Sequence, residues 1–162
     1  MERVARFEKV SAAQFEADWA GAFPGEPNPY ADLALPRRAT AGSAGYDFYS
    51  PIDFRLAPGE ELRLPTGVRA LIRPGWVLML FPRSGLGFKY RLQLNNTVGV
   101  VDADYAGADN EGHIFIKLTN AGGRTVSVAR GEAFAQGIFL PFGITEDDAA
   151  DGRRTGGFGS TN

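Results

Sequence analysis

The chain has no cysteine and only one histidine, His113, among its 162 residues. Without cysteine it can form no disulfide, offer no thiol nucleophile and ligate no metal through thiolates. A single histidine also excludes a multi-histidine metal site within one chain. Any chemistry must therefore rest on carboxylates, hydroxyls, amides and cationic side chains.

Long apolar runs and a strong charge imbalance are also missing. No apolar run approaches the roughly 20 residues needed to span a bilayer, and the first residues lack the apolar stretch of a signal peptide. The net charge is −2 and the isoelectric point about 5.4, whereas proteins that bind nucleic acids or anionic membranes generally carry a basic excess. We therefore predict a cytoplasmic protein with no nucleic-acid and no membrane partner.

The composition is that of one ordinary globular domain. Hydrophobic residues make up 44% and charged residues 22% of the chain, and 162 residues suffice to bury a core. The 21 glycines and 10 prolines, set between short stretches of alternating hydrophobicity, are typical of an all-β sandwich or jelly roll.

The first segment has a helical pattern instead. Ser11 is a candidate N-cap with Gln14 three residues later, which is a capping-box spacing. Phe15 and Trp19 are four residues apart and share one helix face. We predict that residues 1–32 form an N-terminal helical extension that packs on the main domain.

A β domain is expected over residues 33–143, followed by a flexible C-terminal arm over residues 144–162. The arm is first acidic and then basic and rich in glycine, a shift that marks a flexible segment. Alternating or apolar runs predict strands within residues 61–64, 68–73, 76–81, 97–101, 114–118, 124–128 and 133–139.

Three segments between the strands have loop-like compositions that suit a site. Residues 44–50 (AGYDFYS) also fit an ordinary strand start, and residues 82–89 (PRSGLGFK) fit either a phosphate-cradling loop or a plain turn. In residues 95–107 a short apolar strand delivers Asp102 at its end. That carboxylate could accept a proton from water, hold Mg²⁺ through its water shell, or simply cap backbone N–H groups.

The last ten residues, RRTGGFGSTN, carry two guanidinium groups, several glycines and one aromatic ring. Glycines let backbone N–H groups approach an anion closely, and arginine matches phosphate oxygens. Phe158 lies between glycines and could cover a planar ring. The segment is therefore either a solvated terminus or an arm that orders over a nucleotide.

In this order, the segments resemble the five motifs of the trimeric, all-β dUTP nucleotidohydrolases (dUTPases). The resemblance runs from about Leu35 to the C-terminus. It implies the jelly-roll or distorted β-barrel fold of that family, and hydrolysis of dUTP to dUMP and pyrophosphate by a homotrimer with shared sites. The motifs match residues 44–50, 82–87, 96–107, 130–139 and 153–161.

The resemblance implies a role for each matched residue around the base and the sugar. Asp102 would be the general base that activates the attacking water. Tyr105 would stack under the deoxyribose and leave no room for a 2′-hydroxyl. Asn96 would hydrogen-bond the uracil edge, assisted by main-chain groups from Gly99 onward.

Other matched residues would serve the triphosphate. Arg83, Ser84, Gly85 and Gln136 would contact the phosphates, and Asp47 would help to position Mg²⁺ through water. From the arm, Arg153 would clamp the γ-phosphate and Phe158 would cover the uracil, with Gly159 and Ser160 as further substrate contacts. The expected cofactor is Mg²⁺.

Two other functions compete with this reading. A related dCTP deaminase would need an acid/base glutamate near the pyrimidine, and Glu111 is the only glutamate between Asn96 and Thr119. A nucleotide-binding regulator would keep the fold without turnover. We further expect residues 108–112 to form a surface loop and His113 to be a surface or hydrogen-bonding residue rather than a ligand.

Overall fold

Strands dominate the protein, whose computed structural model describes residues 1–152, 154 and 156. The described helices are α1 (Ala12–Ala22), α2 (Ser84–Tyr90) and the 3-10 helices η1 (Tyr30–Asp32) and η2 (Ala103–Gly107). The fold is therefore mainly β, as predicted. In chain order the strands are β1 (Ala5–Lys9), β2 (Arg37–Arg38), β3 (Tyr46–Tyr49), β4 (Phe54–Leu56), β5 (Glu61–Pro65), β6 (Val68–Ile72), β7 (Trp76–Pro82), β8 (Leu92–Leu94), β9 (Gly99–Val101), β10 (Phe115–Asn120), β11 (Val126–Val128) and β12 (Ala133–Pro141).

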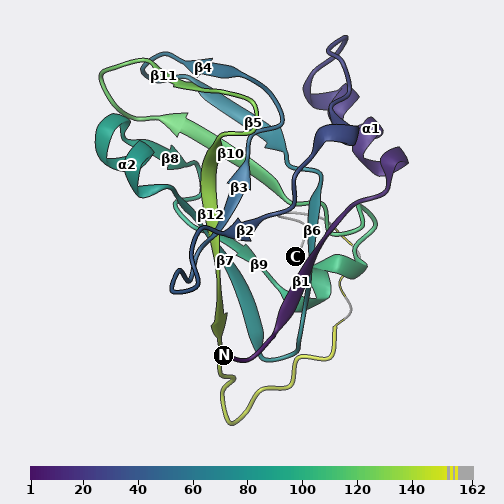
Figure 1. Cartoon of the computed structure of the whole chain (residues 1–162). Helices are drawn as coiled ribbons and strands as arrows, with labels where there is room; N and C mark the ends of the chain where they lie inside the picture. Colours follow the sequence, from purple (N-terminus) through teal and green to yellow (C-terminus); the bar gives the residue numbers. More distant parts are fainter. Residues whose placement is uncertain (153, 155, 157–162) are drawn as a thin grey trace.

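The described strands form four antiparallel sheets (Figure 1). The largest has the order β2-β3-β12-β7-β9, and its long central strands β12 and β7 pair along seven residues. The others are β5-β10-β8, β11-β4 and β1-β6. Hydrogen bonds do not join these sheets into one closed barrel.

The main core lies between the sheets and is built from alternate residues of the strands. In β6, for example, Val68, Ala70 and Ile72 are buried while the residues between them are more exposed. This alternation follows from the two-residue period of a strand. Phe48, Leu78, Leu80, Ile116, Leu118 and Phe134 are among its fully or almost fully buried members.

The N-terminal segment contains a strand that the sequence pattern did not predict. Strand β1 pairs with β6 from Ala5–Ile72 to Lys9–Val68. Its alternation is weak, because three charged residues and a partly buried Phe7 share five positions. The first residues are thus part of a sheet, and only the following helix packs beside it.

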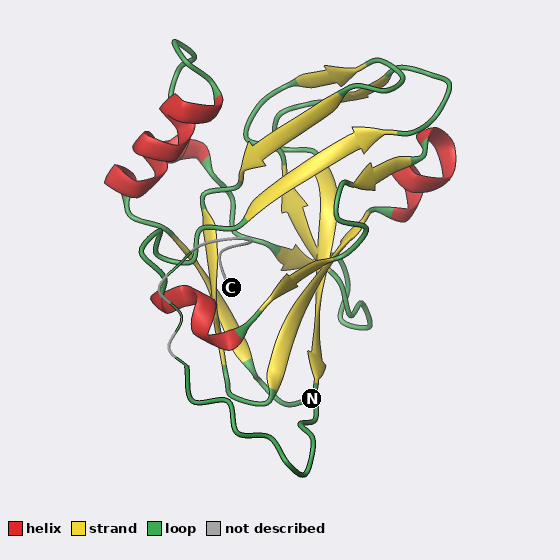
Figure 2. Ribbon diagram, turned by 180° about the vertical axis from the view of Figure 1, so that it is seen from behind, coloured by secondary structure: helices red, strands yellow, loops and turns green. Residues whose placement is uncertain are grey.

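Helix α1 begins as predicted. Ser11 is its N-cap, and the Ser11 hydroxyl accepts a hydrogen bond from the Gln14 N–H at 3.1 Å. Phe15 and Trp19 are buried in a small cluster of their own with Val10. Figure 2 shows α1 outside the strands, at the upper left of that view.

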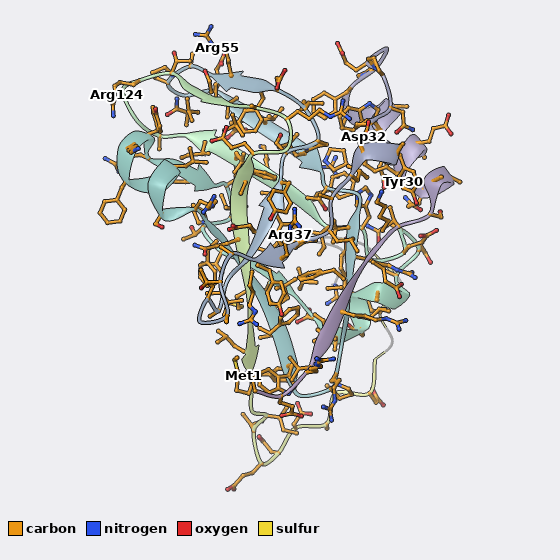
Figure 3. All side chains as sticks on the ribbon, viewed as in Figure 1. Met1, Tyr30, Asp32, Arg37, Arg55 and Arg124 are labelled. Atoms are coloured by element: carbon orange, nitrogen blue, oxygen red, sulfur yellow. The ribbon has the colours of Figure 1, made fainter. Side chains whose placement is uncertain are left out.

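Helix α1 is also tied to the segment that follows it. The Tyr30 hydroxyl donates to the Val10 carbonyl at 2.7 Å, and the Tyr30 and Phe15 rings lie 5.6 Å apart. Figure 3 shows Tyr30 and Asp32 beside α1. Residues 23–33 therefore wrap the helix back onto the domain.

Two segments with loop-like composition are regular structure. Residues 46–49 form β3, paired on both sides with β2 and β12. Residues 84–90 form α2, whose first turn is closed by a hydrogen bond from the Gly87 N–H to the Arg83 carbonyl. Residues 84–90 are therefore helical rather than the loop or turn that their composition suggested, since two glycines in the first turn do not prevent a short helix. Phosphate binding by this segment stays a prediction.

Candidate active site

A pair of carboxylates follows the edge strand of the central sheet. Strand β9 pairs with β7 through Val101 and Leu78, and the next residue, Asp102, is the N-cap of η2 with extended backbone. The side chains of Asp102 and Asp104 are 50% and 58% exposed. A strand end thus presents two accessible carboxylates, as the sequence indicated for Asp102.

Tyr105 follows these carboxylates in η2 and is 3% exposed. Its hydroxyl donates to the His113 carbonyl at 2.7 Å and accepts from the Asn110 amide at 2.9 Å. Burial raises the pKa of the Tyr105 phenol above its ordinary value of 10. The group is therefore neutral and held at both its donor and its acceptor positions.

Arg154 closes this cluster. Its Nη2 donates to Asp102 Oδ2 at 2.5 Å and its Nε donates to Asp104 Oδ1 at 2.9 Å. The guanidinium carbon lies 5.7 Å from the centre of the Tyr105 ring. Arg154 is not among the residues that the sequence analysis assigned to the site, and no local pattern indicates its contact with this carboxylate pair. The γ-phosphate role expected of Arg153 stays a prediction.

The segment between Ala108 and His113 is not a free surface loop. Ala108 and Gly112 are buried, and Glu111 accepts hydrogen bonds from the Ser11 N–H and hydroxyl, both at 2.7 Å. These bonds hold the pKa of Glu111 below its ordinary value of 4.5. The segment is a turn at the surface with Asp109 exposed, as expected, but Glu111 ties it to Ser11, the N-cap of α1.

His113 is completely buried, so its predicted hydrogen-bonding role is confirmed and the surface alternative was wrong. Its Nε2 accepts from the Gly67 N–H at 2.8 Å, and its Nδ1 lies 2.6 Å from Asp18 Oδ2. Since a backbone N–H can only donate, Nε2 carries no proton and Nδ1–H donates to Asp18. The imidazole is therefore neutral.

Acid should weaken the fold through His113. Burial is the main cause that lowers its pKa below 6.5, and Arg63 acts in the same direction while Asp18 and Glu111 oppose it. In the unfolded chain His113 binds a proton near pH 6.5, whereas in the folded chain it stays neutral to lower pH. The free energy of unfolding should therefore fall as the pH drops from about 7 to 5.

Urea unfolding at several pH values checks this expectation. A His113→Gln variant should lack the fall in that window. Three carboxyl groups have a lowered pKa, those of Glu8, Glu61 and Glu111. The stability that they contribute is fully present above pH 4.5 and is lost only as the pH falls below that value. The two windows are therefore separable, and an equal slope in His113→Gln would contradict the assignment.

A second group of polar residues lies where β3, β12 and the end of β7 meet. Asp47 and Gln136 face each other across β3 and β12, and Arg83 Nε lies 3.4 Å from Asp47 Oδ1. The Gln136 amide donates to the Pro82 carbonyl at 3.1 Å. Three of the predicted phosphate and metal residues are thus brought together within one chain.

The remaining described candidates differ in burial. Ser84 and Gly85 are exposed in the first turn of α2, and Asn96 is exposed in the turn before β9. Gly99 is buried in β9, where an added Cβ would lie 2.9 Å from Leu80 Cβ. Any larger residue at Gly99 would therefore push β9 away from β7.

The two polar groups are far apart in one chain. Asp102 continues from Val101, which pairs with Leu78, whereas Arg83 continues from Pro82 at the other end of β7. Four strand residues alone span roughly 13 Å, and the two side chains lie beyond these points in opposite directions. One chain does not bring its base candidate next to its phosphate candidates.

Arg153, Phe158, Gly159 and Ser160 lie outside the described residues. Their assigned roles stay predictions.

Comparison with known proteins decides the family of this chain. The family model described as dUTPase matches residues 31–162. The chain belongs to the dUTPase family. The match includes both polar groups and the C-terminal segment, and the earlier resemblance is confirmed.

Individual dUTPases agree with this membership. The deoxyuridine 5'-triphosphate nucleotidohydrolase of Lactococcus lactis is 42% identical over 134 residues, which cover 81% of this chain and 89% of the relative. The crystal structure of the Streptococcus mutans dUTPase superposes with a TM-score of 0.64 at 35% identity, covering 86% of this chain and 98% of that one. A mutant dUTPase from phage phi11 of Staphylococcus aureus shares the fold at 20% identity, with a TM-score of 0.64 and coverage of 93% and 98%.

Proposed function

We propose that this dUTPase-family protein hydrolyses dUTP to dUMP and pyrophosphate. The observation that carries the proposal is the exposed Asp102 carboxylate at the end of β9, which is linked to the buried Tyr105 through Arg154, since Arg154 bonds to Asp102 and lies over the Tyr105 ring. Family membership supports the same reaction, since relatives at about 40% identity are named for it.

Asp102 would act as the general base. A carboxylate accepts the proton of a water molecule as that water attacks the α-phosphorus in line, and pyrophosphate leaves. No covalent intermediate is required, which suits a chain without cysteine. The ion pair with Arg154 now occupies one Asp102 oxygen. This pair would open as the phosphates of the substrate attract the guanidinium.

Tyr105 and the strand before Asp102 would select the nucleoside. The buried Tyr105 ring would support the deoxyribose and exclude a 2′-hydroxyl. Asn96 and main-chain groups from Gly99 onward would bind the uracil edge. Hydrogen-bonded recognition rejects cytosine strongly, because a mismatched edge leaves buried polar groups unpaired.

Arg83, Ser84, Gly85 and Gln136 would bind the phosphates. Mg²⁺ fits this arrangement as an ion that arrives with the substrate. The described residues contain no group of three or more acidic, histidine or cysteine side chains that could hold a metal by themselves. Mg²⁺ keeps several waters and commonly uses one or two carboxylates plus substrate phosphates, so Asp47 would act through water. Bound there, the ion would neutralise charge on the triphosphate.

The phage phi11 protein offers a related observation, since its structure describes the coordination of a structural Mg(II) ion. That ion is a property of the phage protein. For this chain, removal of Mg²⁺ by a chelator should abolish turnover while leaving the fold intact.

A homotrimer with shared sites would solve the separation of the two polar groups. Residues from neighbouring chains would then complete each site, with the C-terminal residues 144–162 acting as an arm that closes over it. Sedimentation should give a mass about three times the 17.4 kDa of one chain. A monomer at micromolar concentration would contradict both the assembly and the shared site.

The proposal also covers the detailed topology of the fold and the cellular location of the protein. The four sheets would correspond to the jelly roll or distorted barrel of the family, with residues 33–143 as its core. No described helix is long and apolar enough to cross a membrane. A cytoplasmic location and the absence of nucleic-acid partners stay predictions.

Product analysis tests the function directly. The protein is mixed with Mg²⁺ and, in parallel, with dUTP, UTP, dTTP or dCTP. Release of dUMP and pyrophosphate from dUTP alone is the expected result. Ammonia from dCTP would indicate a deaminase. The structure does not favour that outcome, because both carboxylate oxygens of Glu111 already accept hydrogen bonds from Ser11. Bound dUTP without turnover would indicate a regulator.

A further inference from the structure

Helix α1 lies outside the strands, yet it is bonded to the segment that carries the candidate base and the sugar tyrosine. The bonds from Ser11 to Glu111 join the start of the helix to this segment. Asp18, about two turns later, bonds to His113 at the end of this segment. Two points of one helix therefore hold one short segment.

The His113 ring is fixed in orientation from both sides. Nδ1–H donates to Asp18 and Nε2 accepts from the Gly67 N–H. The ring also packs between the Phe115 and Phe15 rings, with centroid distances of 4.6 Å and 5.9 Å. The other tautomer would set two donors against each other at Gly67 and two acceptors at Asp18, and a flipped ring would present carbon atoms to both partners. Either change leaves buried polar groups unpaired, which is costly.

The backbone of the same residue holds Tyr105. The Tyr105 hydroxyl donates to the His113 carbonyl at 2.7 Å. The His113 N–H donates to the Asn110 carbonyl at 3.0 Å, and the Asn110 amide donates to the Tyr105 hydroxyl. A displacement of His113 would therefore move the tip of the tyrosine.

The turn beside His113 has little room to compensate. Gly112 has a φ of +72°, and an added Cβ would lie 2.6 Å from Ala106 Cα and 2.7 Å from the Tyr105 carbonyl oxygen. The Tyr105 carbonyl and the residue after it, Ala106, are thus in close contact with the turn. Motion of His113 would pass to Tyr105 rather than be absorbed between them.

We propose that Asp18 and His113 are positioning residues: through them helix α1 holds Tyr105 where it discriminates deoxyribose from ribose. The proposal rests on the proposed function, because it takes Tyr105 as the residue that contacts the sugar. It gives the N-terminal helix a role in substrate selection, in addition to its contribution to stability.

A variant of Asp18 separates the two roles. Asp18→Ala leaves the buried Nδ1–H without its acceptor, and Glu16→Ala removes a carboxylate from the exposed face of the same helix. We expect Asp18→Ala to raise KM for dUTP and the UTP-to-dUTP ratio of kcat/KM, each about tenfold. Turnover of bound dUTP should change little, and Glu16→Ala should match the wild type.

The conservative variant supplies the rescue. In Asp18→Asn the amide oxygen can still accept from Nδ1–H, so we expect most of the selectivity to return. Because both substrates use the same base, the ratio is insensitive to titration of Asp102. A purely structural role would lower the thermal midpoint of Asp18→Ala without moving this ratio.

A measurement on the wild type covers the case in which Asp18→Ala does not fold. The chain has one histidine, so its imidazole NMR signals need no assignment. We expect the proton on Nδ1, and a shift of these signals when a non-hydrolysable α,β-imido analogue of dUTP binds.

The outcomes separate this inference from the function. A wild type that does not hydrolyse dUTP would overturn the function and this inference with it. With an active wild type, equal ratios for Asp18→Ala and Glu16→Ala would overturn the inference alone. A proton on Nε2, or His113 signals unmoved by the bound analogue, would do the same.

Discussion

Asp102→Asn should lower kcat for dUTP by about a thousandfold and leave binding nearly unchanged. The amide has almost the same shape but cannot accept the proton of the attacking water. The side chain is half exposed, and within the described part of the chain its carboxylate bonds to Arg154, so the fold should tolerate the change. Steady-state release of dUMP, with titration of the imido analogue for binding, measures both parts.

Asp104→Asn is the matched control for this experiment. Asp104 lies two residues away, is similarly exposed and bonds to the same arginine. Its substitution removes the same charge from the same cluster, and we expect kcat to stay within about threefold of the wild type. Equal losses in the two variants would mean that the charge of the cluster, and not a base at Asp102, carries the effect.

Removal of residues 153–162 should lower turnover by about a hundredfold or more, because the proposed arm could no longer close over the site and exclude bulk water. The fold should survive. Of the described residues removed, Arg154 contacts the exposed Asp102 and Asp104, and exposed ion pairs each contribute at most about 1 kcal/mol. Turnover and thermal unfolding of the truncated chain, measured side by side, check this expectation.

An Arg154→Ala variant separates the contribution of this arginine from that of the rest of the arm. Arg154 neutralises two carboxylates that the polyanionic substrate must approach, so its loss should raise KM. A truncated chain with wild-type turnover would show that the arm has no role in the reaction. A truncated chain that unfolds would show that the arm is part of the domain.

The strongest local patterns predicted their elements well. Trp76–Pro82 and Ala133–Pro141 form the long central strands because their apolar residues can be buried on either face of a sheet. The Ser11 cap and the Phe15–Trp19 pair predicted α1 correctly because both signals are local and act within about one turn of helix.

Weak or short patterns failed. Strand β1 is charged and barely alternates, and its conformation depends on pairing with β6, about sixty residues away. The segment after Pro82 contains glycines that suited a loop, yet it closes a helical turn onto Arg83. In β1 a contact distant along the chain overrides the intrinsic preference, whereas α2 closes through a local bond in spite of its glycines.

The sequence by itself determined the family and the chemical types at the site, because the motifs and the Asp102–Tyr105 spacing are local properties of the chain. Only the tertiary structure decided that Arg154 bridges the two carboxylates, that Glu111 caps a distant helix and that His113 is buried against Asp18. These partners are between 50 and 100 residues apart. Which of several equivalent charges meets which is fixed by the packing of the sheets, and no pattern within one segment encodes it.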